Sequence, residues 1–392
     1  MNTLLLRDAR LVQDGCITPC DILIRGQNVE SILPARSGAA ADCVRDLKGL
    51  YLSAGFIDIH VHGGGGHDFM DGTPEAYHGA SALHLQHGTT AMLPTTLAAS
   101  ADELLRAFSV FEQCRDAFPD GAKLLGLHIE GPYVAPSQAG AQDPKYIRNP
   151  DPAEYNMLLD ACPHILRWTV APELPGAMEF GRELKRRGIL PCIGHSEADS
   201  DTVLEAMRCG YSHITHLYSA TSTIVRVAGF RHAGIIESAY LYDGLTSEII
   251  ADGCHLPAPL LQLAYRHIGP RRLVLVTDAM RAAGQTGGES ILGSLENGQR
   301  VILEDGVAKM PDRTAFAGSI CTADRLVRTM VTMAGASLPD AVQMITETPA
   351  RLLGLDDRFG RVEPGRAADL AVFDHTIRIA MVLRDGAVRY EN

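Results

Sequence analysis

Histidine, glutamate and aspartate recur at the ends of short apolar runs in the middle of the chain. His60 and His62 close the run GFIDIHVH, and four later runs end in one such residue each: Glu130, His195, His216 and Asp278. Imidazole and carboxylate groups without a thiolate suit Zn²⁺, Fe²⁺ and similar borderline cations. Such an ion lowers the pKa of bound water toward about 7, which provides hydroxide at neutral pH. The residues therefore indicate metal-assisted hydrolysis.

Spacing strengthens this interpretation at the first run. In a strand, residues i and i+2 point to one face, so His60 and His62 can share an ion. The glycines at 63–66 let the backbone bend close to an ion or substrate. Each of the six positions has an ordinary alternative: a packed histidine, an arginine partner for Glu130, or a helix N-cap for Asp278. All six standing at expected strand ends favours a metal centre.

The elements that must position these residues alternate between strand-like and helical patterns. Helical spacing of apolar residues occurs, for example, at 100–118 and 199–210. The expected strands are GFIDIHVH, TTAMLPTT, KLLGLHIE, RWTVAP, ILPCIGH, SHITHL, SEIIAD and LVLVTD. Eight strands interleaved with helices predict an α/β fold, a (β/α)₈ TIM-like barrel. The carboxyl ends of the strands meet at one rim of such a barrel, so the six side chains would converge there.

The two ends of the chain differ from this middle block. Residues 3–52 and the last segment from RVEPG onward read as short strands with Gly, Asp and Asn turn signals. We expect a small β-sandwich domain built from both chain ends, residues 1–52 with 355–392. It would stand beside a catalytic barrel of residues 53–354.

Charge and composition exclude several kinds of partner. The formal net charge of −12 repels phosphate backbones, which argues against nucleic acid but leaves a small anionic substrate open. No apolar run approaches the roughly 18 residues of a membrane helix, and the start lacks signal-peptide features. The nine cysteines are odd in number and form no C-x-x-C pair. We therefore expect reduced thiols and a cytoplasmic protein with no membrane partner.

Several motifs, taken in order, are similar to those of the N-acetylglucosamine-6-phosphate deacetylases, a branch of the amidohydrolase superfamily. They span nearly the whole barrel with the order and spacing of that family. The matching segments are GFIDIHVHGGGG, GLHIEGPY, AGAQDPKYIR, IGHSEA, THLYSA, IADGCH, LVTDAMRAAG, AGS at 317–319 and the late GRVEPGRAADLAVFD. The resemblance implies hydrolysis of the N-acetyl amide of an amino-sugar phosphate.

The resemblance also implies a metal role for each matching position. Glu130, His195 and His216 match the principal ligands. His60 and His62 match the pair that holds a second ion in some members, so one or two ions are expected, with Zn²⁺ favoured over Fe, Co, Mn or Ni. Asp278 matches the general base that later acts as general acid. His128, two residues before Glu130, is expected only to support the ligands.

A second group of positions is implied to contact the substrate. Gln142 matches a residue near the substrate amide, and the others match sugar and phosphate contacts: Ser219, Ala220, Arg231 and His255. The family places such an arginine often in a neighbouring subunit, which implies a homo-oligomer, either a dimer or a tetramer.

The departures from the family fall at the substrate end. Where the family reads HLYNA or HLFNA and then R-E-P-G, this chain reads HLYSATSTIVRVAGFRHAG, with Ser219 in place of Asn and about four extra residues. The sugar, the acyl group and the need for phosphate therefore stay open. Arg226 is a second cation that could replace Arg231.

Two other functions compete with a deacetylase. A cyclic-amide hydrolase of the dihydroorotase and hydantoinase kind would bridge two metals with a carboxylated lysine, whereas here Glu130 ends the third run and Lys123 only begins it. A catalytically silent sugar-phosphate sensor would be expected to have lost a ligand or the base, yet all six positions are filled.

Overall fold

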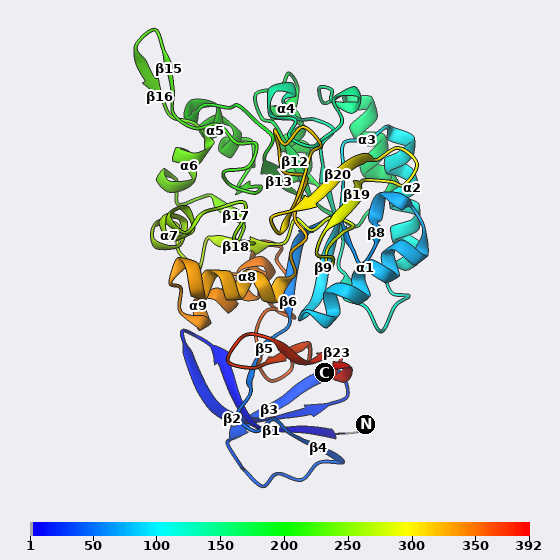
Figure 1. Cartoon of the computed structure of the whole chain (residues 1–392), viewed down its shortest axis with the longest axis vertical. Coiled ribbons are helices and arrows are strands. Elements are labelled where there is room, and N and C mark those ends of the chain that lie inside the picture. Colours follow the sequence, from blue (N-terminus) through cyan, green and yellow to red (C-terminus); the bar gives the residue numbers. More distant parts are fainter. Residues whose placement is uncertain (1–2) are drawn as a thin grey trace.

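The computed structural model describes residues 3–392 and has two parts stacked along its long axis (Figure 1). The larger part is a barrel surrounded by helices. The smaller part is a sheet that contains strands from both ends of the chain, and both termini lie beside it (Figure 1). The whole chain is therefore arranged around one barrel, with the sheet below it.

Eight parallel strands form the barrel wall in the order β6, β9, β11, β12, β13, β14, β17 and β18. Backbone hydrogen bonds close the wall between its first and last strands, from His62 N to Ala279 O (2.8 Å) and from Asp278 N to His60 O (2.9 Å). The strands are β6 Phe56–Val61, β9 Thr89–Thr96, β11 Leu127–Glu130, β12 Ile165–Val170, β13 Leu190–Ile193, β14 His213–Ile214, β17 Thr246–Ile250 and β18 Leu273–Val276. The predicted (β/α)₈ barrel is confirmed.

Each of the eight predicted runs contains one wall strand, but the third run is broken. Residues 123–130 form two short strands, β10 (Lys123–Leu124) and β11, which pair with different stretches of β9. A Cβ at Gly126, between them, would lie 2.6 Å from the carbonyl oxygen of His164. The chain therefore passes too close to the start of β12 for any side chain at this position.

Helices cover the outside of the barrel. Ser100 caps α2 together with Glu103, and Leu104, Phe108 and Phe111 on its inner face are fully buried. The helices are α1 Pro74–Gln86, α2 Ala101–Cys114, α3 Pro152–Ala161, α4 Ala177–Arg186, α5 Ser200–Arg208, α6 Ile235–Leu241, α7 Ala258–His267, α8 Ala323–Thr329, α9 Leu338–Gln343 and α10 Glu347–Leu352. Between residues 3 and 392, no helix combines the length and apolar character needed to cross a membrane.

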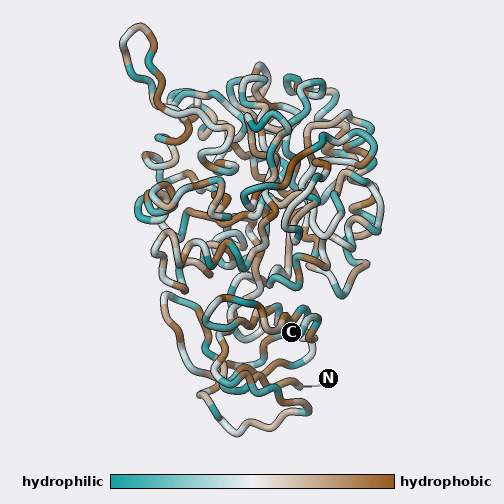
Figure 2. The backbone as a smooth tube through the Cα atoms, in the orientation of Figure 1, coloured by the Kyte–Doolittle hydropathy of each residue, from teal (hydrophilic) through white to brown (hydrophobic). Residues whose placement is uncertain are grey.

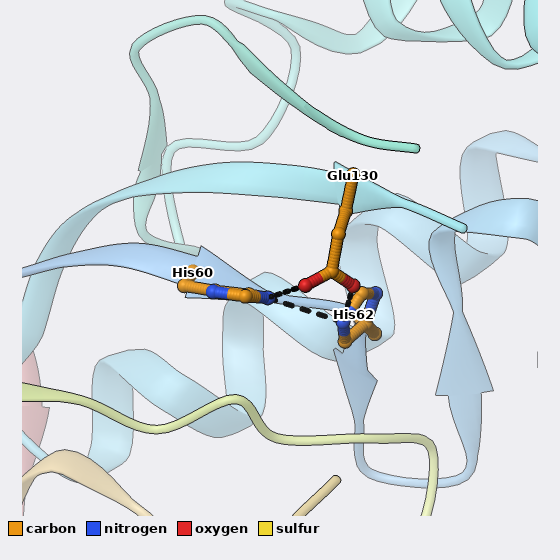
Figure 3. A group of neighbouring side chains, drawn as sticks. All are labelled: His60, His62 and Glu130. Atoms are coloured by element: carbon orange, nitrogen blue, oxygen red, sulfur yellow. Dashed lines mark hydrogen bonds and ion pairs between the residues drawn. The ribbon is translucent and has the colours of Figure 1, made fainter. Parts of the chain in front are cut away.

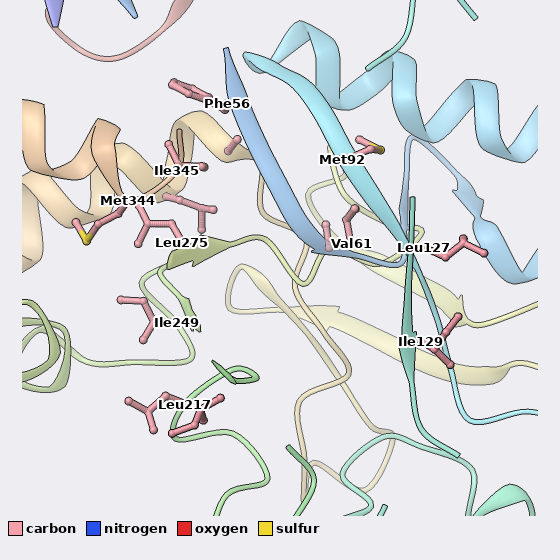
Figure 4. Packing of buried hydrophobic residues seen from close by; sticks show 14 of the residues in the cluster. Phe56, Val61, Met92, Leu127, Ile129, Leu217, Ile249, Leu275, Met344 and Ile345 are labelled. Atoms are coloured by element: carbon pink, nitrogen blue, oxygen red, sulfur yellow. The ribbon is translucent and has the colours of Figure 1, made fainter. Parts of the chain in front are cut away.

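The main hydrophobic core consists of apolar side chains from strands and helices far apart in sequence. Figure 4 shows Val61, Met92, Leu127 and Ile129 around β6, β9 and β11, with Leu275 near Ile345. All residues of β6, β9, β11 and β18 are buried. These strands are covered on both faces, so buried polar residues alternate with the apolar ones in β6 and β11.

Both chain ends contribute to a second sheet of eight strands, as the sequence predicts. Its order is β24-β23-β22-β5-β1-β2-β3, with β4 also paired to β1. The strands are β1 Thr3–Gln13, β2 Cys16–Arg25, β3 Asn28–Pro34, β4 Cys43–Asp46, β5 Tyr51–Ala54, β22 Leu370–Phe373, β23 Ile379–Arg384 and β24 Ala387–Glu391. A bulge in β1 between Leu6 and Ala9 shifts its parallel partner from β4 to β5. This unit has its own core, which includes Ile22, Leu52 and Leu383.

Two insertions interrupt the barrel pattern. A hairpin of β15 (Val225–Val227) and β16 (Phe230–His232) projects away from the molecule (Figure 1). A three-stranded sheet of β19 (Gly288–Leu292), β20 (Gln299–Glu304) and β21 (Val307–Lys309) follows β18. The sequence did not indicate this second insertion. The remaining short elements are β7 Gly63–Gly64, β8 His67–Asp68, η1 Phe69–Asp71, η2 Pro136–Gln138, η3 Pro144–Tyr146 and η4 Met330–Ala334.

Candidate metal centre and active site

Five potential metal ligands meet at the carboxyl ends of the barrel strands. His60 lies in β6, His62 follows it, and Glu130 ends the neighbouring strand β11, so that its carboxylate faces both imidazoles (Figure 3). His195 and His216 follow β13 and β14. The structure therefore brings together residues that are up to 156 positions apart, as a barrel rim requires.

Glu130 is the centre of this group. One carboxylate oxygen, Oε1, lies 2.9 Å from His216 Nε2, 3.2 Å from His195 Nε2 and 3.4 Å from His60 Nε2. The other, Oε2, lies 3.4 Å from His62 Nε2. Two triads of the right size for a metal ion result, and Glu130 belongs to both: His60–His62–Glu130 and Glu130–His195–His216.

Hydrogen bonds orient three of the four imidazoles. His195 Nδ1 lies 2.8 Å from the carbonyl oxygen of Gln138, and His216 Nδ1 lies 3.1 Å from that of Ser219. A carbonyl only accepts, so Nδ1 carries the proton in both rings and each Nε2 lone pair points toward Glu130. His60 Nδ1 faces the Glu248 carboxylate at 3.0 Å with the same consequence.

The charges of the cluster favour a bound cation. Burial alone would lower the pKa of His60, but the carboxylates Glu130, Asp278 and Glu248 raise it well above the usual value. Burial also opposes ionisation of Glu130, yet His60 and His195 hold its pKa well below the usual range. Buried carboxylates in such a site are stabilised by protonated imidazoles or by an ion. Inward-facing nitrogen lone pairs and carboxylate oxygens without sulfur fit a divalent borderline metal.

The backbone is strained where the strands end. His195, His216 and Asp278 have φ angles of 49°, 29° and 46°, in the left-handed region that residues with a side chain rarely adopt. Each lies two residues beyond the end of a barrel strand, at the rim. Such strain persists only where surrounding structure fixes it, and it is typical of functional sites.

Asp278 stands beside the His60–His62 pair. Its Oδ1 lies 3.2 Å from His62 Nε2 and 3.4 Å from His60 Nε2. Burial would raise the pKa of Asp278, but the two imidazoles lower it below the usual value. The AGS segment at 317–319 fixes the backbone of this residue, because Ser319 N donates a hydrogen bond to Asp278 O at 2.8 Å.

A fully buried ionic network supports the ligands from within the barrel. Glu248 in β17 accepts hydrogen bonds from Arg167 in β12 and His213 in β14, in addition to His60. It also accepts from the backbone N–H of His216 at 3.2 Å. Glu248 therefore connects both metal triads. Nothing in the sequence singled it out, because its role depends on which strands are neighbours around the barrel.

A cavity of about 310 Å³ opens over the cluster. Four of the five predicted substrate residues line it, namely Gln142, Ser219, Ala220 and His255, and it is also lined by His62, Glu130, His195, His216 and Asp278. Gln142 is bonded on both sides, accepting from Ala98 N at 2.7 Å and donating to Glu130 Oε2 at 2.8 Å. Sequence reasoning missed Tyr218, Leu292 and Phe316 in the lining.

Arg231 does not lie at this cavity in the single chain. It stands in β16 of the projecting hairpin, exposed, and bonds only the carbonyl of Gly229 at 3.1 Å. Of the residues that the structure describes, no arginine or lysine lines the cavity. His128, expected only as support, bonds Thr95 and Thr169 and none of the ligands.

Comparison with known proteins agrees with this geometry. The model of the amidohydrolase family matches residues 51–389. The N-acetylglucosamine-6-phosphate deacetylase of Lysinibacillus sphaericus is 34% identical over 350 residues, which is 88% of this chain and 87% of the relative. The N-acetylgalactosamine-6-phosphate deacetylase of Escherichia coli O157:H7 is 32% identical and covers 86% of both chains.

Solved structures agree over the full length. The N-acetylglucosamine-6-phosphate deacetylase of Pasteurella multocida superposes with a TM-score of 0.91 at 27% identity and covers 100% of both chains. A mutant of the Mycobacterium smegmatis enzyme in complex with N-acetyl-D-glucosamine-6-phosphate gives 0.90 at 30% identity, covering 99% of this chain and 100% of the other. This chain is a metal-dependent hydrolase that belongs to the amidohydrolase family, in its N-acetylglucosamine-6-phosphate deacetylase branch.

Proposed function

We propose that the protein hydrolyses the N-acetyl amide of N-acetylglucosamine-6-phosphate and releases glucosamine-6-phosphate and acetate. The observation that carries this proposal is the convergence of Glu130, four imidazoles and Asp278 at one cavity. The named activities of relatives at 32–34% identity support the substrate class. One of those relatives acts on the galactosamine isomer, so the sugar is the part of the proposal that most needs a test.

Glu130, His195 and His216 would hold one divalent ion, and His60 and His62 would hold a second with Glu130 shared. The all-nitrogen-and-oxygen set favours Zn²⁺, and Fe, Co, Mn and Ni are the other candidates. An ion bound there supplies Lewis-acid chemistry: it polarises a carbonyl and lowers the pKa of water.

Asp278 would move the proton. Its carboxylate is ionised, lines the cavity and stands beside the ligands, so it can accept a proton from the attacking water. Returning that proton to the amine nitrogen makes the amine a good leaving group. Gln142 has a second amide hydrogen besides the one bonded to Glu130, and this hydrogen can stabilise negative charge on the substrate oxygen.

Phosphate recognition would require a second copy of the chain. The cavity has no basic lining residue in one copy, whereas the hairpin carries Arg226 directly opposite Arg231. Neither guanidinium forms an ion pair with a carboxylate of residues 3–392, so two like charges face each other at its tip. A phosphate between them would remove this repulsion and accept paired hydrogen bonds.

The hairpin has the composition of an interface. Strand alternation places Val225, Val227 and Phe230 on the face opposite the arginines, and Phe230 is 75% exposed. Figure 2 shows hydrophobic residues along this projecting segment. Apolar side chains on an isolated projection are unfavourable in water, so we propose a homo-oligomer, at least a dimer, in which the hairpin packs against a partner.

A deacetylation panel tests the substrate. Metal-loaded protein would be given N-acetylglucosamine, N-acetylgalactosamine and their 6-phosphates, with amine release as the readout. We expect N-acetylglucosamine-6-phosphate to have the highest kcat/KM. A preference for unphosphorylated sugars would move the function to another N-acyl amide, which the change at Ser219 leaves possible, and no turnover of any amide would favour a sensor.

Coexpression of Arg231→Ala and Asp278→Asn subunits tests the second copy. Each variant alone should turn over the phosphorylated sugar poorly. If the hairpin completes the partner's site, half of the random dimers have one intact site, and activity returns to about a quarter of wild type. Activity that stays at the level of the separate variants would rule out the exchange, and normal kcat/KM in Arg231→Ala would remove the arginine's role.

Two further expectations remain proposals. The boundaries 1–52 with 355–392 and 53–354 stay a proposal, because the first of them falls within β5 (Tyr51–Ala54) of the end sheet, and limited proteolysis would test them. All nine cysteines are free, which supports a reducing, cytoplasmic environment.

A further inference from the structure

A second cluster of metal-ligating side chains lies outside the active site, on the helical ring. It consists of Glu112 in the last turn of α2, Cys162 directly after α3, and His164 directly before β12. Their ligand atoms all lie within 4.8 Å of one another. α2 and α3 are neighbours on the outside of the barrel (Figure 1), so tertiary packing brings the three residues together.

The distances are close to those of a metal site. His164 Nδ1 lies 2.7 Å from Glu112 Oε1, and Cys162 Sγ lies 3.2 Å from the same oxygen. Ligand atoms of a tetrahedral Zn²⁺ site are separated by roughly 3.3–3.6 Å, given bond lengths of about 2.0–2.3 Å. The histidine and glutamate would need to separate by about half an ångström. Both side chains are about one-third exposed and free to do so, at 32% and 34%.

The thiol is protonated in its present surroundings, where its Sγ donates to Glu112 Oε1. Burial raises the pKa of Cys162 to about 12, and Glu112 contributes in the same direction. The backbone N–H of His164 bonds the sulfur and Arg115 lies nearby, and both favour the thiolate. A divalent ion would displace the thiol proton, so binding should strengthen as pH rises.

The position separates this cluster from the catalytic centre. His164 precedes β12 at the amino end of the barrel strands, whereas the catalytic residues lie at the carboxyl ends. The six residues of β12 span on the order of 20 Å. An ion here cannot take part in the hydrolysis, but it would connect α2, α3 and β12 and stabilise the folded chain by mass action.

We propose that Glu112, Cys162 and His164 form a separate binding site for one thiophilic divalent cation such as Zn²⁺, with a structural role and with water as the remaining ligand. A Cys, His and Glu set with an open position is chemically distinct from the catalytic set, which has no sulfur. This difference makes the two sites distinguishable by spectroscopy.

Loading the enzyme with cobalt(II) as its only metal tests the proposal. Thiolate bound to Co²⁺ gives an intense near-ultraviolet charge-transfer band that imidazole and carboxylate cannot give. We expect the band of one thiolate-bound Co²⁺ per chain in wild type, and one more bound metal per chain by elemental analysis than the catalytic centre alone holds. Both should be lost in Cys162→Ser and in His164→Phe, the second of which keeps the ring and every cysteine.

Cys209→Ser is the matched control, because Cys209 is also buried directly after a helix, α5, but is not part of the cluster. It should keep the band and the additional equivalent. A wild-type protein without the band would overturn the proposal. So would a band that survives in Cys162→Ser, because another thiol would then be the ligand, or in His164→Phe, because the histidine would then not be part of the site. Deacetylase activity should be unchanged in all three variants.

Discussion

At the scale of single residues, Asp278 differs from the other members of the cluster in the contacts that fix it. The imidazoles of His195 and His216 are each bonded on their outer nitrogen, and Glu130 is held by Gln142. The carboxylate of Asp278 is bonded only toward His62 and His60 and otherwise faces the cavity. A carboxylate with one side toward the candidate ligands and the other toward the cavity fits the proton transfer proposed for Asp278.

Asp278→Asn should keep the bound metal and lose turnover. The amide has nearly the same shape but cannot accept a proton, so kcat should fall by about 10²–10⁴, the usual contribution of a general acid–base group. Metal content by elemental analysis and kcat with saturating substrate are the two measurements. An unchanged kcat would remove the role, and lost metal would make Asp278 a ligand instead.

The burial of His84 should make the stability of the folded chain depend on pH. It lies in α1, fully buried, and its Nε2 donates to the carbonyl of Gly63 at 2.9 Å, directly behind the metal ligands. Burial lowers its pKa from 6.5 to about 4. Between pH 6.5 and pH 4 this histidine is protonated in the unfolded chain but neutral in the folded chain. Its full contribution to the free energy of unfolding is therefore present above pH 6.5 and is lost as the pH falls toward 4.

Removing this histidine should therefore weaken the acid dependence. Between pH 7 and pH 5 the folded protein should lose about 2 kcal/mol through His84 alone. This loss is measured by urea unfolding of wild type and of His84→Gln at both pH values. Glutamine is chosen because its amide can still donate to the carbonyl of Gly63. The control is His267→Gln at an exposed position, which should keep the pH dependence of the wild type. If His84→Gln lost as much free energy of unfolding between pH 7 and pH 5 as the wild type does, the prediction would be wrong.

At the scale of elements, the site is built from residues at, or within two positions of, the carboxyl ends of the barrel strands. The wall strands supply a rigid, buried frame, and a left-handed residue after β13, β14 and β18 turns His195, His216 and Asp278 inward. The segment after β18 is held by a neighbouring turn at Gly318. Its φ is 68°, and an added Cβ would lie 2.8 Å from Asp278 O. Glycine here lets two backbones pass each other at the active site.

Gly318→Ala should displace Asp278 and reduce turnover without removing the metal. A shift of about 1 Å in a reacting group can cost about 100-fold in rate, so we expect kcat to fall by about 10–100-fold. Gly335→Ala is a close control, because Gly335 has a similar φ of 71° but open space around its Cβ position. Gly335→Ala should lower the stability of the folded chain and leave kcat unchanged. Equal kinetic effects in both variants would mean that backbone strain, not the contact with Asp278, is responsible.

At the scale of the whole molecule, a buried ion pair joins the barrel to the end sheet. Lys123 in β10 lies 2.5 Å from Asp369, just before β22, and 2.7 Å from Asp385, just after β23. The lysine and Asp369 side chains are 10% and 5% exposed. Arg384 reaches the same region and bonds the carbonyls of Phe118 and Gly121. The end sheet is thus attached to the barrel by charges as well as by apolar contacts.

Lys123→Met should destabilise the chain by about 3–5 kcal/mol, because it leaves buried carboxylates without a partner. Lys145→Met removes a surface pair with Asp143, whose lysine is 54% exposed, and should cost less than about 1 kcal/mol. Adding Asp369→Leu to Lys123→Met should recover part of the loss. Chemical unfolding of the three variants gives the values, and similar losses in both lysine variants would contradict the buried pair.

The sequence by itself determined the kind of chemistry and the barrel that positions it. The sequence states which side chains can donate to a metal, and several of the eight expected strands end in His, Glu or Asp, so His60, Glu130 and Asp278 could be singled out without coordinates. The same local reasoning predicted a single strand at 123–130, which the close approach at Gly126 divides in two.

Tertiary structure decided the features that depend on neighbours distant in sequence. Glu248 bonds His60 because only β18 separates β17 from β6 around the barrel wall, and Arg231 stands outside the cavity because its hairpin extends away from the rim. Glu112, Cys162 and His164 meet only because α2 packs beside α3. Hydrogen bonds and ligand distances act over a few ångströms in space, and only the packed chain determines which residues are that close.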